Sequence, residues 1–236
     1  MARVPLIVEV AGLAGSGKTT LSRMLCEQQS QRFQPGVRLR LKSIRHFPYS
    51  LRHGLFLLPK LLHSIRKRRL LTGEEMKKIA YVEGWHRVLT RQDTGANAVV
   101  VLDQGPVFCL ATLYGFGPHW LRGEDFEPWW SRIFDQWSAV LRAVVCLHAP
   151  LDILLKRIKS RETNHIIKES SQREMREFLS CYRNAYEHVL CQLRARRELK
   201  VVHVSTARNS MGAVMMEVLD ALHGEFARSR SARVNR

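Results

Sequence analysis

The stretch Gly12-Leu13-Ala14-Gly15-Ser16-Gly17-Lys18-Thr19 determines how this 236-residue chain folds. It follows the apolar run 4–10 and leads into a helical pattern of apolar residues at 21, 24 and 25. In a loop of this spacing, successive backbone N–H groups point inward and bind an anion, and the next helix adds about half a positive charge. Lys18 would reach the β- and γ-phosphates of a nucleotide, and the Thr19 hydroxyl would bind Mg²⁺. The stretch therefore predicts a strand, a loop and a helix that bind ATP or GTP through Gly12, Gly15, Ser16, Gly17, Lys18, Thr19 and Thr20.

Apolar strands alternate with helical patterns along the rest of the chain. This order predicts an α/β fold, a three-layer sandwich with a five-stranded parallel sheet. The alternating charges of 37–44 indicate an edge strand, and the continuous apolar run 98–103 is typical of a strand buried on both faces. We expect strands at 4–11, 37–44, 98–103, 143–148 and 200–204. We expect helices at 18–30, 50–70, 73–92, 106–116, 150–160, 171–197 and 209–224, with an irregular and then helical segment at 117–142.

The pattern shows no internal repeat and no interdomain linker, so we expect one domain over residues 1–225. Within it, residues 50–92 would form a helical flank, and residues from about 157 to 170 would form a lid. The remaining residues, 226–236, are polar and rich in arginine, a composition that predicts a disordered basic tail. A monomer and a homodimer are both compatible with the sequence.

The formal net charge of +17 is the one unusual total of the composition. The basic residues concentrate in 66–69, in 156–161 and in the tail. Such a charge attracts polyanions, that is nucleotides, nucleic acid or acidic membranes. The sequence lacks the aromatic RNP motif and the GXXG loop of common RNA-binding modules. A solvated surface and a cluster that binds phosphates therefore explain the charge better than nucleic acid does.

Two further features narrow the class of protein. None of the five cysteines forms a C-x-x-C pair, so the sequence predicts neither a disulfide framework nor a zinc site. Residues 1–10 run straight into the loop without a signal peptide, and the longest apolar stretch, 55–62, is too short to cross a bilayer. We therefore expect a cytoplasmic protein without membrane partners.

Two carboxylates stand out beside the predicted loop. Asp103 ends the apolar run 98–103, where it could hold Mg²⁺ through water or orient an attacking hydroxyl. The alternative role for Asp103 is to cap the helix that Pro106 begins. Glu9 lies inside an apolar strand, where an unpaired carboxylate costs several kcal/mol. We expect Glu9 either to pair with a buried arginine or to point into the site.

Together these segments resemble the nucleoside and nucleotide kinases, and most of all the thymidylate kinases. The stretch 12–20 is similar to that family's Gly-Leu-Asp-Gly-Ala-Gly-Lys-Thr-Thr, and 101–104 is similar to its strand that ends in Asp-Arg. Residues 147–161 resemble its strand, its helix that begins at proline and its arginine-bearing lid, and residues 178–186 resemble the helix after that lid. The resemblance spans about 10–210 and implies phosphoryl transfer from ATP, with Mg²⁺, to a small acceptor.

The resemblance also assigns roles on the ATP side. Its catalytic residues would be Lys18, Asp103, Arg157 and Arg161. The two arginines lie four residues apart, so they would share one helix face and bind the transferring phosphoryl group in the lid. The alternative for the arginines is a solvated basic surface. Thr19 and Asp103 would hold Mg²⁺, and Ser205 and Thr206 would contact adenine.

On the acceptor side, the resemblance points to the helix at 73–92. The expected substrate-binding residues are Tyr81, Glu83, Trp85 and Arg87. Tyr81 or Trp85 would stack on a ring, and Arg87 would bind an acceptor phosphate or a polar sugar. The alternative for the two aromatic residues is a place in the core.

The chain departs from the thymidylate kinases at two positions. Ala14 stands where that family has an acidic residue beside the substrate, and Gln104 stands where it has an arginine that holds an acceptor phosphate. These departures indicate a different small acceptor. The main hypothesis is an ATP-dependent kinase of a nucleoside or nucleotide. Two alternatives stay open: a kinase for a sugar or antibiotic-type acceptor, and a nucleotide-binding regulatory protein or NTPase with affinity for polyanions.

Overall fold

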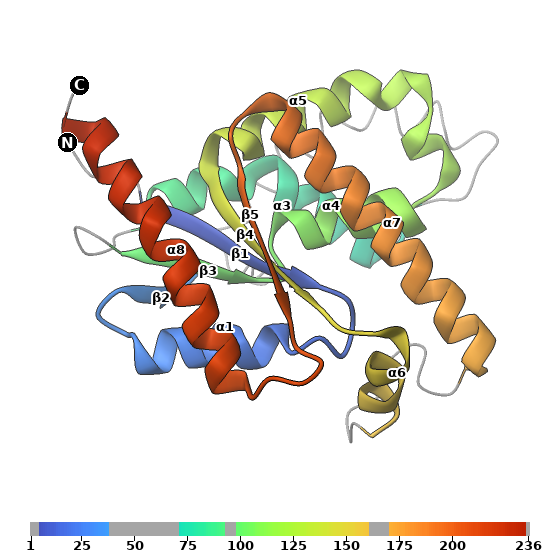
Figure 1. Ribbon diagram of the computed structural model, residues 1–236. Helices are drawn as coiled ribbons and strands as arrows, with labels where there is room; N and C mark the ends of the chain where they lie inside the picture. Colours follow the sequence, from blue (N-terminus) through green and yellow to red (C-terminus); the bar gives the residue numbers. More distant parts are fainter. Residues whose placement is uncertain (1–4, 38–70, 93–97, 161–169, 235–236) are drawn as a thin grey trace.

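A computed structural model describes residues 5–37, 71–92, 98–160 and 170–234 of the chain. Its centre is one sheet of five parallel strands in the order β2-β3-β1-β4-β5 (Figure 1). The strands are β1 (Leu6–Gly12), β2 (Phe33–Pro35), β3 (Val99–Asp103), β4 (Leu141–His148) and β5 (Lys200–Ser205). Because all five strands run in the same direction, their carboxyl ends and the loops that follow meet at one edge of the sheet.

Helices cover both faces of the sheet and complete the predicted three-layer sandwich (Figure 1). One face carries α1 (Lys18–Gln28) and α8 (Met211–Val234). The other face carries α3 (Gly73–Thr90), α4 (Pro106–Phe116), α5 (Glu127–Val140) and α7 (Gln172–Arg196). The short helix α6 (Leu151–Lys159) follows β4, and two 3₁₀ helices, η1 (His119–Arg122) and η2 (Glu124–Phe126), precede α5.

The sheet divides the core into two clusters, and β1 contributes to both. Ile7 packs in the cluster with α4 and α7, and Val8 packs in the cluster with α1 and α8. Both side chains are fully buried, because successive residues of a strand point to opposite faces of a sheet that is covered on both sides. This double burial explains why β1 and β3 are apolar runs without alternation.

Helix α3 begins where the sequence predicts, because a reciprocal cap fixes its first turn. The Thr72 hydroxyl accepts a hydrogen bond from the Glu75 N–H at 3.2 Å, and the Glu75 carboxylate accepts one from the Thr72 N–H at 2.7 Å. These bonds satisfy backbone donors that a helix N-terminus otherwise leaves unpaired. The observed helix ends at Thr90, two residues before the predicted end.

The second strand differs from the predicted one. It covers Phe33–Pro35, whereas the charge alternation pointed to 37–44. Phe33 is almost completely buried and pairs with Val99, so the chain enters the sheet soon after α1 ends. Proline is tolerated there because β2 is an edge strand of the described sheet, the position expected for the second strand. Of the predicted strand only Val37 lies within the described residues, and the predicted helix 50–70 lies outside them.

The C-terminal segment also differs from the prediction. Helix α8 continues to Val234, so the basic segment that was expected to be disordered from 226 onward is helical up to that residue. Alanine, arginine and glutamate favour helices, and no proline interrupts them here. Neither α8 nor any other helix in the described ranges is both long and apolar enough to cross a membrane.

Candidate active site

The loop from Gly12 to Thr19 connects β1 to α1, as the sequence predicts. Gly12 has a φ of 142° and Gly17 a φ of 93°, which are backbone conformations that other residues rarely adopt. A Cβ atom on Gly12 would lie 2.3 Å from the carbonyl oxygen of Leu147 in β4. Glycine at this position therefore lets the loop pass close to the neighbouring strand end.

The N-terminus of α1 is open to an anion. Gly17 occupies the N-cap position, so no side chain caps this helix, and its first turn contains no acidic residue. The N–H groups at the start of α1 and the helix dipole therefore present positive charge toward the loop.

The polar side chains of the loop lie next to these open amides. The Lys18 ammonium crosses the loop and donates a hydrogen bond to the Leu13 carbonyl oxygen at 2.8 Å. Thr19 and Thr20 are exposed, whereas Ser16 is fully buried and its hydroxyl has no hydrogen-bond partner. The segment can thus offer an ammonium group and backbone amides to phosphates, and a hydroxyl to a cation.

Asp103 is the last residue of β3, and it pairs in register with Val10 of β1. The Asp103 carboxylate therefore lies at the end of β3, next to the end of β1, and β1 leads into the phosphate loop. The Oδ1 atom of Asp103 is buried without a hydrogen-bond partner, an arrangement that is costly until a ligand, a metal or water satisfies it. The next residue, Gln104, has a left-handed φ of 63°. A buried unpaired oxygen beside a strained residue is typical of a functional site.

Glu9 is fully buried in β1 and caps α4 from that neighbouring strand. Its Oε2 accepts a hydrogen bond from the Val107 N–H at 2.7 Å, and its Oε1 accepts one from the Phe108 N–H at 2.9 Å. The expected arginine partner is absent from the described part of the chain, and the carboxylate is bound to α4 rather than directed into the site. Because Glu9 takes this position, Asp103 does not cap α4.

The stability of the fold should depend on the protonation of Glu9. Burial raises the pKa of Glu9 from 4.5 to about 8, although the amide groups of α4 act in the opposite direction. Between these values the folded protein keeps a proton that the unfolded chain releases. The free energy of unfolding should therefore fall as the pH rises from about 4.5 to about 8, as urea denaturation across this range would measure.

The matched control for this pH dependence is Glu9→Gln, which removes the titrating group and should flatten the profile. His188 contributes a slope of opposite sign, because burial lowers its pKa. That contribution is the same in both proteins and cancels in their difference. A wild-type profile that parallels the variant's would contradict the assignment.

Arg157 on α6 ties the phosphate loop to the loop after β5. Its Nη1 donates to the Thr206 hydroxyl at 3.1 Å, and its Nη2 donates to the Thr206 carbonyl oxygen at 2.6 Å. Nη1 also lies 3.4 Å from the carbonyl oxygen of Gly15. Thr206 is buried, and its N–H donates to the carbonyl oxygen of His148 at the end of β4. Three loops at the carboxyl edge of the sheet are thus joined through one guanidinium group.

The other residues expected around the nucleotide and the lid lie as follows. Ser205 is half-buried at the end of β5, directly before Thr206. Arg161, expected on the same helix face as Arg157, lies outside the described residues, and so does the expected lid beyond it.

Arg157→Ala should weaken ATP binding about tenfold, because hydrogen bonds from a charged group that hold the loop would be lost. Isothermal titration with Mg²⁺·ATP measures this change. The control is Lys156→Ala, which removes an exposed cation from the same helix and should leave the affinity unchanged. An unchanged affinity with a large loss of turnover would instead mean that Arg157 leaves Thr206 and acts on the transferring phosphoryl group.

Glu83, expected to bind the acceptor, joins α3 to α5. It is 2% exposed, and its carboxylate accepts hydrogen bonds from the Trp129 indole at 2.6 Å and from the Arg132 guanidinium at 2.5 and 3.0 Å. A buried carboxylate requires such partners. The acceptor role expected for Glu83 thus gives way to a structural one.

The other three expected residues of α3 have different surroundings. Trp85 is buried and its indole donates to the Val37 carbonyl oxygen at 2.7 Å, so Trp85 also has a structural contact. Tyr81 is half-buried and its ring stacks with that of Trp137, the centroids 5.9 Å apart. Arg87 is exposed. The structure therefore does not bring the four side chains together in one pocket.

Sequence reasoning found only half of an aromatic and hydroxyl cluster between α4 and α7. We name the α4–α7 cluster by its members, Phe108, Thr112, Phe116, Phe178, Tyr182 and Tyr186. The Tyr182 hydroxyl is hydrogen-bonded to that of Thr112, whereas the buried Tyr186 hydroxyl has no partner. The three members on α4, at 108, 112 and 116, were not predicted, although their spacing of four residues was a signal that they share one helix face.

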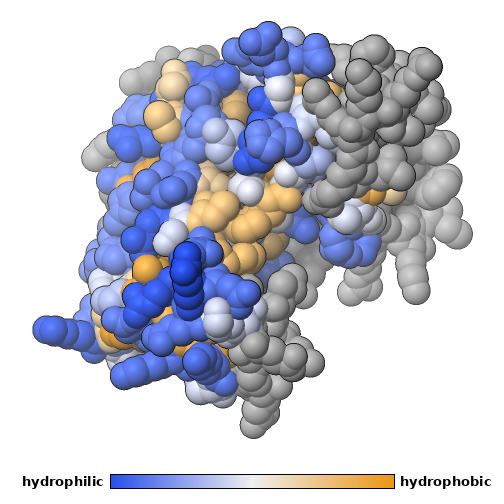
Figure 2. Space-filling view, turned by 90° about the vertical axis from the view of Figure 1, so that its right-hand side faces the viewer, coloured by the Kyte–Doolittle hydropathy of each residue, from blue (hydrophilic) through white to orange (hydrophobic). Residues whose placement is uncertain are grey.

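Figure 2 shows an apolar area with hydrophilic side chains around it on the side of the molecule where α6 and α7 lie.

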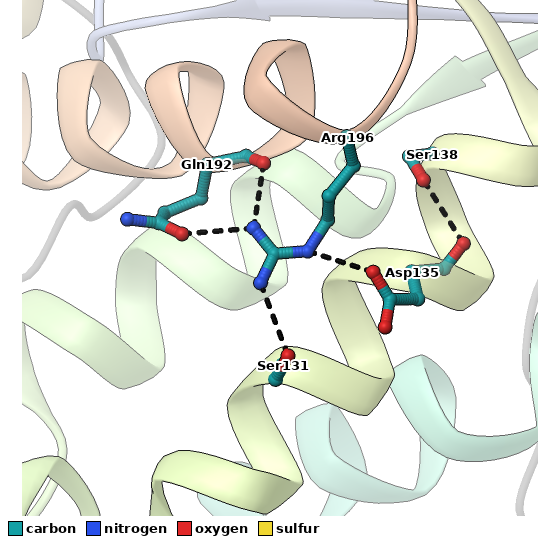
Figure 3. A network of polar contacts seen from close by, with 5 residues as sticks. All are labelled: Ser131, Asp135, Ser138, Gln192 and Arg196. Atoms are coloured by element: carbon teal, nitrogen blue, oxygen red, sulfur yellow. Dashed lines mark hydrogen bonds and ion pairs between the residues drawn. The ribbon is translucent and has the colours of Figure 1, made fainter.

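A separate cavity of about 290 Å³ lies between α4, α5 and the C-terminal end of α7. Arg196 lines it and donates hydrogen bonds to Asp135, Gln192 and Ser131 (Figure 3). These bonds fix the end of α7 against α5. No residue that lines this cavity belongs to the phosphate loop or to a strand end, so we do not include it in the candidate active site.

Comparisons with known proteins bear on the family and the fold of the chain. The model of a family described as AAA domain matches residues 7–187. Among solved structures, the deoxyadenosine kinase from M. mycoides with bound dATP has a TM-score of 0.51 at 12% identity, covering 92% of this chain and 100% of that one. The YorR protein from Bacillus subtilis, in complex with phosphorylated GDP, has a TM-score of 0.50 at 15% identity, covering 92% and 95%. No curated protein sequence matches the chain.

At such identities the likeness to solved structures concerns the fold. Together with the strand order, it confirms the predicted α/β fold with a five-stranded parallel sheet of the P-loop kinase type. The finer resemblance to thymidylate kinases is not specifically supported by these matches.

Proposed function

We propose that this chain, which belongs to the AAA domain family, is a kinase that transfers a phosphoryl group from ATP to a small acceptor, a nucleoside or a nucleotide. The observation that carries the proposal is the open phosphate loop beside Asp103, whose buried Oδ1 has no partner. A phosphate loop alone suits any nucleotide-binding protein. A carboxylate at the next strand end is in addition able to orient an attacking hydroxyl.

On the ATP side, the amide groups at the start of α1 and the Lys18 ammonium would bind the phosphates. The Thr19 hydroxyl and the Asp103 carboxylate are oxygen donors of the kind that suits Mg²⁺, which neutralises charge on the phosphate oxygens when bound. Lys18 would stabilise the charge that spreads over the transferring group. Asp103 would hold the cation through water or accept the proton of the attacking hydroxyl.

The adenine would lie near Ser205 and Thr206. Since the Thr206 hydroxyl and carbonyl are bound by Arg157, we propose that Thr206 shapes this region through its backbone, while Ser205 offers a half-buried hydroxyl. Arg157 would then hold the loops around the nucleotide, and Arg161 remains our proposed lid arginine.

For the acceptor, we favour a nucleoside over thymidylate. Gln104 places an exposed neutral amide where the thymidylate kinase resemblance implies an arginine on a phosphate. The α4–α7 cluster offers aromatic faces that suit a nucleobase, and the unpaired Tyr186 hydroxyl could bond a polar atom. Arg87 remains a proposed contact for a polar acceptor group. One protein with a similar fold is a deoxyadenosine kinase, so deoxynucleosides are the first acceptors to test.

Acceptor-dependent release of ADP tests this function. The full chain with Mg²⁺·ATP would be offered deoxynucleosides, nucleotides including thymidylate, sugars and aminoglycosides, and we expect release to require a nucleoside. Equal ADP release with and without every acceptor would contradict the kinase and favour an NTPase. No turnover, together with nucleic-acid binding that weakens steeply with salt, would favour a polyanion-binding protein.

A further inference from the structure

Glu9 connects the two halves of the candidate active site. It lies in β1, three residues before Gly12, and therefore in the strand that leads into the phosphate loop. Its carboxylate accepts hydrogen bonds from the first N–H groups of α4, and only two residues, 104 and 105, separate Asp103 from the start of α4. One buried side chain thus bridges the strand before the loop and the turn after Asp103.

The turn after Asp103 has a shape that its own residues do not favour. Gln104 has a φ of 63°, a conformation that a residue with a side chain keeps only where its surroundings enforce it. Gly105 packs so closely on Glu9 that a Cβ atom there would lie 2.8 Å from Oε2. The helix that follows has no side-chain cap of its own, so Glu9 supplies the bonds that fix its first turn.

Asp103 lacks a bond that would hold the buried side of its carboxylate in place. Its Oδ1 is buried and unpartnered, so its position depends on the backbone on either side. Before Asp103 the backbone is held by the β3 ladder beside Val10. After Asp103 it is held by the start of α4, which Glu9 fixes.

We propose that Glu9 is a positioning residue: by capping α4 from β1, it holds the turn at 103–105, and with it the Asp103 carboxylate, in register with the phosphate loop. The expected effect on turnover rests on the proposed kinase function, whereas the effect on the turn does not. Since the nucleotide-binding groups lie on the loop and on α1, losing this cap should lower kcat and leave KM for ATP nearly unchanged.

Glu9→Gln tests the proposal with two measurements. Both measurements are made at about pH 9, above the pKa of about 8 at which the buried Glu9 carboxyl loses its proton. At that pH the variant keeps the size of the side chain but replaces one acceptor oxygen of the carboxylate by an N–H₂ group that faces a backbone N–H. Hydrogen exchange at the Val107 and Phe108 amides should become at least about tenfold faster. In the acceptor-dependent assay, kcat should fall by about tenfold to a hundredfold, with KM for ATP within about twofold of wild type.

The matched control is Val218→Ala, which shortens a fully buried side chain of α8 on the opposite face of the sheet. This substitution should lower the free energy of unfolding. Any change in hydrogen exchange at the Val107 and Phe108 amides, or in kcat, should then reflect only that general loss of stability. If exchange at these amides is no faster in Glu9→Gln than in the control, the cap is overturned. If kcat falls no further than in the control, or if the loss is in KM for ATP, the positioning role is overturned. If wild type phosphorylates no acceptor, the proposed function fails and exchange alone decides on the cap.

Discussion

Lys18→Ala should lower kcat by on the order of 10²–10³-fold, the usual cost of removing one group that stabilises transition-state charge. Lys18 is the first residue of α1, and its ammonium group reaches back across the phosphate loop to the Leu13 carbonyl oxygen. It therefore places a positive charge where the phosphates would bind. Alanine leaves those amides in place, so ATP should still bind, although more weakly. Acceptor-dependent ADP release measures kcat, and titration with Mg²⁺·ATP measures the affinity.

The control for this substitution is Lys156→Ala, which removes an exposed lysine from α6 and should retain full activity. Lys18→Ala should also stay folded, with an unfolding midpoint within about 2–4 °C of wild type, since the side chain is not part of the core. Wild-type turnover in Lys18→Ala would show that the loop is not the site of phosphoryl transfer.

Gly12→Ala should destabilise the fold by about 3 kcal/mol and abolish nucleotide binding. The φ of 142° is unfavourable for alanine, and the new Cβ would lie 2.3 Å from the Leu147 carbonyl oxygen. Because that oxygen belongs to the backbone of β4, the clash is relieved only if the loop or the strand moves. Urea denaturation measures the loss of stability, and titration with Mg²⁺·ATP measures the loss of binding.

Gly73→Ala is the matched control, because a Cβ atom there meets nothing within 4 Å. Gly73 begins α3, so alanine should leave the free energy of unfolding unchanged or raise it by up to about 1 kcal/mol. If the two substitutions changed the free energy of unfolding and ATP binding equally, the close approach of the loop to β4 would not be what requires glycine at position 12.

The strand, loop and helix around 12–19 could be predicted because their signals are local. Glycine spacing, an apolar run before the loop and a helical pattern after it all lie within about 20 residues. The cap of α3 is local too, since Thr72 and Glu75 are three residues apart. The strand Phe33–Pro35 could not be predicted this way, because it forms through the burial of Phe33 beside Val99, a contact between segments far apart in the sequence.

The candidate site could be predicted where the strand order alone brings residues together. Lys18 and Asp103 belong to neighbouring strand ends, and any parallel sheet with β1 beside β3 places them at one edge. The partners of Arg157 could not be predicted, because Thr206 is 49 residues away and meets it through a third loop.

Local patterns along the chain were enough to predict the phosphate loop, the alternation of strands and helices and the carboxylate at the end of β3. In contrast, no local pattern indicates that Glu9 caps a helix 98 residues away or that Arg132 binds Glu83, 49 residues away; these contacts follow from how distant elements pack. Backbone dihedral angles and hydrophobic periodicity act over a few residues and leave a pattern that can be read along the chain. A buried carboxylate is satisfied by whichever donors the packing of the elements brings to it, and that packing is a property of the folded whole.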